Sequence, residues 1–199
     1  MVRFSPCGAG IRIDELTLRV PDLPVSVLGL SDLIGAALRA GTFSGQLRYG
    51  ETGERPHLTL SGKCHDISLA ECTAGLTTRP WRGTGTEIEL KELVLENGRP
   101  RRLRFGGVLT GLMLADVLAP WVQSDFGGEL ALRVRDADLS ANGVQRLVAS
   151  GQCTRLSLEP LTRALGLGEM TGTARLTISD LAIQDNRLSS LDAVGGKVC

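Results

Sequence analysis

Four side chains that commonly bind metals lie within a span of sixteen residues: His57, Cys64, His65 and Cys72. Imidazole nitrogens and thiolates are usual zinc ligands, so a zinc site is one interpretation. The other is that both cysteines are small core residues, as free thiols usually are. The repeat described below favours the core, because Cys64 and Cys72 occupy positions taken by leucine, valine or cysteine in other copies. We therefore predict no metal site.

Carboxylates recur at one place in the chain and could suggest acid-base catalysis. They are Glu15, Glu92, Asp136 and Asp180. Because they recur with the repeat, a structural role explains them better than a reaction does. The chain has no G-x-S-x-G sequence, and the glycines at 83–86 lack the lysine of a phosphate-binding loop. We predict a protein that is not an enzyme and binds no cofactor.

The densest basic stretch contains four arginines, Arg99, Arg101, Arg102 and Arg104. It follows a predicted turn, so a solvated hairpin end is the simplest interpretation. Contact with anionic lipid headgroups is the alternative. The chain as a whole carries 22 basic and 22 acidic residues, which gives no electrostatic reason to bind nucleic acid.

These residues are positioned by an internal repeat of about 44 residues. Leu103, Leu147 and Leu191 illustrate it, because each stands nineteen residues after the start of its own copy. A fixed period with apolar residues in phase indicates a repeat architecture. We predict a single repeat-built domain over residues 1–199, a fragment of a longer chain because its last copy breaks off. The predicted units are 7–43, 44–83, 84–127, 128–171 and 172–199.

Alternating apolar residues within each unit predict a mainly antiparallel β protein, with helical spacing where units join. The alternation slips by one residue at Asp14-Glu15, Lys91-Glu92, Arg135-Asp136 and Ser179-Asp180, which predicts a bulge or bend. Turns are expected at Asn97-Gly98, Asn142-Gly143 and Asp185-Asn186. The predicted strands are 11–20, 44–49, 57–64, 86–95, 101–109, 129–139, 144–153, 173–183 and 187–194. The predicted helices are 31–39, 115–121 and 159–165.

One face of these strands is apolar, and we predict that it forms a shared surface. Its residues are Ile88, Leu90, Leu103, Phe105, Gly107, Leu109, Leu132, Val134, Leu147, Ala149, Gly151, Cys153, Leu176 and Ile178. Gly62, Gly107, Gly151 and Gly195 recur on this face of the returning strands. Glycine inside a strand suggests close approach by another group, which could be an acyl chain or a packed helix.

The strand pair with an acidic bend, a turn with asparagine and a glycine-marked return resembles the AsmA-like family of bacterial envelope proteins. Residues 176–183, 188–195 and 139–151 carry this resemblance. It implies a long curved sheet with an apolar groove, phospholipid transfer between the two membranes and outer-membrane homeostasis. It also implies a periplasmic or envelope location, phospholipid and envelope proteins as partners, and no catalytic residues. The chain departs from the family in having no apolar run long enough for a transmembrane helix, including the N-terminal one.

Two functions follow from the apolar face. If it is an open groove, it binds or conducts phospholipid acyl chains, or supports outer-membrane assembly. If the junction helices close it, the chain is a structural or protein-interaction module of the envelope or of a secretion system, with an ordinary core.

Overall fold

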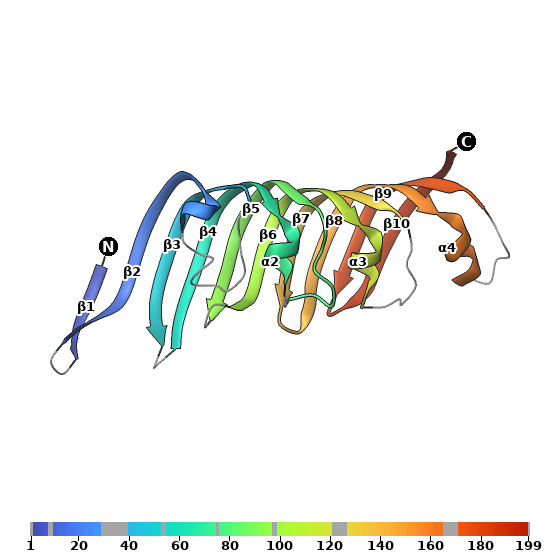
Figure 1. Ribbon diagram of the computed structural model, residues 1–199. Coiled ribbons are helices and arrows are strands. Elements are labelled where there is room, and N and C mark those ends of the chain that lie inside the picture. The colour runs from blue at the N-terminus through green and yellow to red at the C-terminus, as the bar shows by residue number, and fades with distance from the viewer. Residues whose placement is uncertain are drawn as a thin grey trace.

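The described residues form one antiparallel sheet of ten strands whose spatial order equals their order in the chain (Figure 1). The structure is a computed structural model and describes residues 2–7, 10–28, 40–52, 55–74, 76–96, 99–120, 127–164 and 171–198. The strands are β1 (Val2–Cys7), β2 (Gly10–Pro24), β3 (Thr42–Thr52), β4 (Arg55–Ser68), β5 (Thr84–Glu96), β6 (Arg99–Met113), β7 (Glu129–Ser140), β8 (Gly143–Ser157), β9 (Thr173–Gln184) and β10 (Arg187–Val198). The predicted mainly antiparallel β fold is therefore confirmed, while the unit length of about 44 residues stays a prediction.

All nine predicted strands coincide with β2–β10, although most of the observed strands are a few residues longer. β1 was not predicted. The strand predicted over 11–20, which stops before Pro21, is too short, because β2 continues to Pro24. Its pairing with β3 is irregular between Val20 and Leu23, where a proline without an N–H costs no ladder bond. The connection between the strands predicted over 44–49 and 57–64 is also shorter than predicted, since β3 reaches Thr52 and β4 begins at Arg55.

Short helices lie at the junctions between strand pairs. They are a 3-10 turn η1 (Val25–Leu28) and the α-helices α2 (Leu69–Thr73), α3 (Leu114–Leu118) and α4 (Leu158–Ala164). The helices predicted at 115–121 and 159–165 correspond to α3 and α4. The one predicted at 31–39 lies outside the described residues. Helix α2 was not predicted, although the repeat aligns Leu69 and Cys72 with Leu158 and Leu161.

Every predicted slip in alternation is a bulge in the sheet. At each slip one residue has no partner on the neighbouring strand, and the register of pairing shifts there. These residues are Asp14, Lys91, Arg135 and Ser179. An extra residue bends its strand and restores the apolar side chains to one face. The predicted bends are confirmed.

The two hairpin turns within the described residues differ in type. Asp185 and Asn186 both have positive φ, 49° and 58°, which is the predicted two-residue turn. The other turn consists of Ala141 and Asn142, with Gly143 (φ 100°) opening β8, so it begins one residue earlier than predicted. The remaining predicted turn, 97–98, lies outside the described residues.

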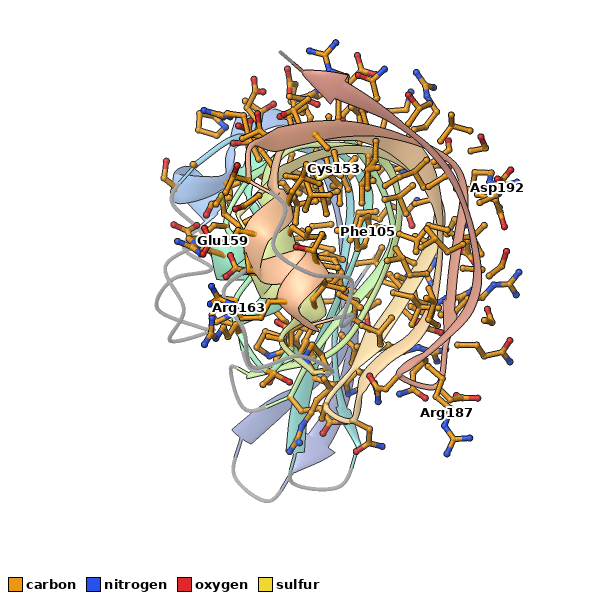
Figure 2. All side chains as sticks on the ribbon, turned by 90° about the vertical axis from the view of Figure 1, so that its right-hand side faces the viewer. Phe105, Cys153, Glu159, Arg163, Arg187 and Asp192 are labelled. Carbon is orange, nitrogen blue, oxygen red and sulfur yellow. The ribbon has the colours of Figure 1, made fainter. Side chains whose placement is uncertain are left out.

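The sheet curls around its apolar face, as the view along its length shows (Figure 2). Phe105 and Cys153 lie inside the curve, whereas Arg187 and Asp192 lie on its outside. Buried side chains from Val25 to Ile183 form one hydrophobic cluster on the inner face. The bulges and the twist of the strands supply the curvature that encloses this cluster.

Candidate functional site: the apolar interior of the curved sheet

The predicted apolar face is the inner face of the sheet and is almost completely covered. Leu109, Ala149 and Leu147 have exposed fractions of 0%, 0% and 1%. The other buried members of the predicted set are Ile88, Leu90, Leu103, Phe105, Leu132, Val134, Cys153 and Ile178. Leu176 is half-buried and packs against the cluster. The structure thus brings the predicted apolar side chains together, while their contact with lipid stays a prediction.

Gly107 and Gly151 are closely approached, as predicted, but by neighbouring backbone and not by the suggested acyl chain or packed helix. A Cβ on Gly107, whose φ is 138°, would lie 2.0 Å from the carbonyl oxygen of Glu87. A Cβ on Gly151 would lie 2.1 Å from the carbonyl oxygen of Ala131. The group that approaches each glycine is therefore the backbone of the preceding strand.

A small cavity of about 40 Å³ lies in the N-terminal half of this interior. Its walls are entirely apolar and come from β3 to β6, η1 and α2. The lining residues are Val25, Phe43, Leu60, Cys64, Ile67, Leu69, Cys72, Ile88, Leu90, Leu93, Leu103 and Phe105. Such a space has room for water but no polar group to hold it, so it favours an apolar occupant.

Each junction is closed onto the sheet by the same backbone hydrogen bond. The N–H of the first helical residue donates to the carbonyl oxygen of the glycine at or just before the start of the next strand. The pairs are Val25–Gly41 at 2.9 Å, and Leu69–Gly83, Leu114–Gly128 and Leu158–Gly172 at 3.1 Å. These bonds fix the helices as a row along the open side of the curve (Figures 1 and 2).

Helix α2 and the segment after it form the cover nearest the cavity. The Thr73 hydroxyl donates to the carbonyl of Leu69 at 2.8 Å and accepts the Trp81 backbone N–H at 2.9 Å. Leu76 and Trp81 are both buried. A helix of five residues is marginal by itself, so these contacts and the apolar burial hold the cover in place.

The cover is attached to the next junction by a half-buried ion pair. Asp116 on α3 accepts the Arg82 backbone N–H at 3.1 Å and two guanidinium N–H groups at 2.8 and 3.0 Å. The Asp116 side chain is 4% exposed and that of Arg82 is 62% exposed. Burial by itself raises the pKa of Asp116, but its hydrogen bonds from Arg82 lower the pKa overall. The pair links segments 34 residues apart.

Cys64 and Cys72 lie in the core, as predicted. Burial raises the pKa of the Cys64 thiol to about 12. Burial also raises that of Cys72 to about 12, with smaller contributions from Cys64 and Glu71. Both side chains are therefore protonated thiols at neutral pH. His65 is exposed on the outside of the sheet, and no group of three metal-binding side chains gathers among the described residues.

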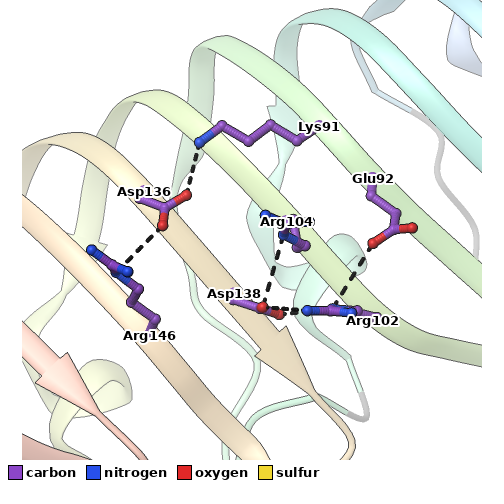
Figure 3. Close-up of polar contacts among 7 residues, drawn as sticks. All are labelled: Lys91, Glu92, Arg102, Arg104, Asp136, Asp138 and Arg146. Atoms are coloured by element: carbon purple, nitrogen blue, oxygen red, sulfur yellow. Dashed lines mark hydrogen bonds and ion pairs between the residues drawn. The ribbon is translucent and has the colours of Figure 1, made fainter.

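Of the predicted headgroup-binding arginines, Arg102 and Arg104 lie on the outer face and take part in ion pairs (Figure 3). Arg102 binds Asp138 at 2.7 Å and Glu92 at 3.9 Å, and Arg104 lies 3.8 Å from Asp138. Arg101 pairs with Glu96 at 3.3 Å. The side chain of Arg99 lies outside the described residues. Headgroup contact stays a prediction, but these charges are largely balanced and lie on the face opposite the apolar interior.

The recurring acidic residues Glu92, Asp136 and Asp180 are also on the outer face, at the bulges. The side chain of Glu15 lies outside the described residues. Asp136 accepts a hydrogen bond from Lys91 at 2.7 Å and lies 3.4 Å from Arg146. Asp180 accepts one from Arg135 at 2.6 Å. The hydrogen bond from Lys91 lowers the pKa of Asp136 below its ordinary value. Asp136 and Asp180 thus each meet a cation in the bulge of the preceding unit, which supports a structural role. Glu92 lies 3.9 Å from Arg102 on the returning strand of its own unit.

The sequence interpretation missed Arg82, Asp116 and Trp81. One signal was present: Asp116 aligns in the repeat with Glu71, so an acid recurs in this part of the junction. The partner of that acid follows no period and could not be found in this way.

Comparison of the chain with models of protein families, with curated proteins and with solved structures gives no match to any of them. The resemblance to the AsmA-like family therefore stays a prediction. None of the helices in the described ranges has the length and apolarity needed to cross a membrane.

Proposed function

We propose that this chain is a non-enzymatic protein of the bacterial cell envelope whose curved sheet holds phospholipid acyl chains along its inner face. In this role it would conduct lipid between membranes or support outer-membrane assembly. The observation that carries the proposal is the single apolar cluster that runs along the inside of the sheet, from Val25 at its N-terminal end to Ile183 near its C-terminal end. A continuous apolar interior is what an extended hydrocarbon chain requires.

Entry of an acyl chain requires the cover to move. A cavity of about 40 Å³ is far smaller than a phospholipid acyl chain, which fills hundreds of cubic ångströms in sites of ordinary size. Helices α2 and α3 have five residues each and gain little stability from their own hydrogen bonds. Because helix α2 is short and the cover is joined to the next junction through the pair Arg82–Asp116, the cover is the part of the interior wall that we expect to move.

A second function is favoured by the burial of the inner face. Side chains such as Leu109, Leu112 and Leu139 are fully buried without any ligand. An interior filled to this degree is also the core of a structural or protein-interaction module. The proposed lipid function and this alternative differ in whether the interior ever admits hydrocarbon.

The deciding experiment measures phospholipid bound to the protein after purification from a bacterial host, by extraction and mass spectrometry. We expect bound phospholipid in the unchanged protein and a several-fold loss in Cys64→Leu, because the added methyl groups fill the cavity. His65→Leu is the matched control, since this neighbour is exposed on the outer face and should keep its lipid.

Both variants should retain a β-type circular dichroism spectrum, so that loss of lipid is not loss of fold. Absence of phospholipid from the unchanged protein, even after incubation with phospholipid vesicles, would leave the closed-core module as the function.

A further inference from the structure

The last strand, β10, presents an unpaired edge and an uncovered apolar side. It pairs with β9, and in the described part of the chain no strand lies on its other side. Leu188 and Leu191 stand opposite Ile183 and Leu181, so they belong to the inner face. Each is nevertheless 56% exposed.

The other returning strands show what occupies this position. On its far side β4 is paired by β5, β6 by β7 and β8 by β9. Leu103 lies opposite Leu139, and Leu147 lies opposite Ile183, with both leucines buried as a result. Leu191 takes the place of Leu103 and Leu147 in the repeat but has no such partner among the described residues.

The sizes of the paired side chains on the inner face indicate which residues a strand paired with β10 would carry. In one pair the large Phe105 is opposed by the small Ala137, and in the next the small Ala149 is opposed by the large Leu181. The corresponding residue of β10 is Ala193. A strand that packs well on β10 therefore carries a large apolar residue opposite Ala193 and another opposite Leu191.

The charges on the outer face specify a further residue of the strand that would pair with β10. On the outer face Arg104 is opposed by Asp138, with 3.8 Å between their charged groups. Two units later the residue in the place of Arg104 is Asp192, which is exposed and forms no ion pair with any described side chain. The charge requirement is thus reversed, and the neighbour needs a cation where β7 has an acid.

We propose that β10 is a docking edge for an added antiparallel β-strand with a large apolar residue, a lysine or arginine, and a second large apolar residue in succession. Strand addition at a sheet edge combines backbone hydrogen bonds with pockets for alternate side chains, which gives both affinity and register. The proposal concerns a protein strand as the ligand and does not depend on lipid in the interior.

The test uses two peptides based on Glu129–Ser140, the strand that pairs with β6. Both carry Ala137→Leu, and one also carries Asp138→Lys, so they differ only in the residue that would oppose Asp192. Titration calorimetry should show about five- to tenfold tighter binding of the lysine peptide, because it exchanges a like-charge for an opposite-charge contact. Backbone amides of β10 should gain protection from hydrogen exchange on binding.

A charge swap in the protein provides the control. In Asp192→Lys the preference should reverse, so that the peptide with Asp138 binds more tightly. Asp192 is exposed, so this variant should fold as the unchanged protein does. Three results would overturn the proposal: no binding of either peptide, a preference that the swap leaves unchanged, or a self-associated protein whose β10 edge is already occupied by a second copy.

Discussion

Strands β8 and β10 have matching places in the repeat but opposite surroundings. Leu147 on β8 is 1% exposed, and Leu191, 44 residues later, is 56% exposed. β8 lies between β7 and β9, whereas β10 has one neighbour among the described strands. The difference teaches that a residue's place in the repeat fixes which face of the sheet it occupies. Whether that face is covered depends on the next strand.

The glycines of the two strands differ in the same way. A Cβ on Gly151 would collide with backbone, but one on Gly195 would meet only the side-chain atom Cδ2 of Leu176 at 3.1 Å. Backbone cannot move aside without disturbing the ladder, whereas a leucine tip can rotate. Glycine is therefore required at position 151 in β8, whereas position 195 in β10 can accept a small side chain.

The largest expected effect separates the two leucines. Leu147→Asp should lower the free energy of unfolding by about 3–5 kcal/mol, because a buried unpaired charge loses its water. Leu191→Asp should change it by about 0.5 kcal/mol or less. Urea unfolding followed by circular dichroism measures both. Equal effects would mean that β10 is covered in solution.

The glycine pair should give the next effect. Gly151→Ala is expected to cost about 1–3 kcal/mol, since the strand must shift to clear the carbonyl of Ala131. Gly195→Ala should be close to neutral. The same unfolding measurement applies, and a neutral Gly151→Ala would contradict the close backbone approach.

The ion pair between junctions should give a third, intermediate effect. Asp116→Asn should cost about 1.5–3 kcal/mol, because it weakens three hydrogen bonds made to a charged group. It should also loosen the cover over the cavity. Alkylation with site assignment by mass spectrometry should then proceed faster at Cys72, which α2 buries against the cavity, than in the unchanged protein. Cys153 provides the internal control, and equal acceleration at both would indicate global unfolding instead.

The repeat aligns Asp116 with Pro160 in the next unit. The acid of that junction is Glu159 instead, which pairs with Arg163 in its own helix at 2.8 Å.

The smallest expected effect concerns the bulges. The lowered pKa of Asp136 means that its pair with Lys91 stabilises the fold above the ordinary carboxyl pKa and is lost as pH falls through the folded-state value. Lys91→Met should reduce stability at pH 7 by about 0.2–1 kcal/mol, since the pair is partly exposed. It should also make the acid-induced loss of stability shallower. Urea midpoints at neutral and acidic pH check this, with Arg175→Met, an exposed change outside the pair, as control.

Much of the fold was predictable because its information is local. Alternation with a period of two fixes the face of each side chain, so the inner position of Leu103 and Phe105 followed from sequence. The slip at Arg135-Asp136 marked a bulge for the same reason. Pro21 misled the prediction because a proline ends a strand only where its missing N–H is needed for pairing.

The sequence by itself determined that this chain forms a bulged antiparallel sheet with one apolar face, short helices at its junctions and cysteines in its core. Only the tertiary structure decided that the Gly107 Cα faces a neighbouring backbone, that Arg82 reaches Asp116, and that Leu147 is buried while Leu191 is not. The physical reason is that periodicity encodes direction within one strand. Coverage, close approach and ion pairing depend on segments brought together from elsewhere in the chain.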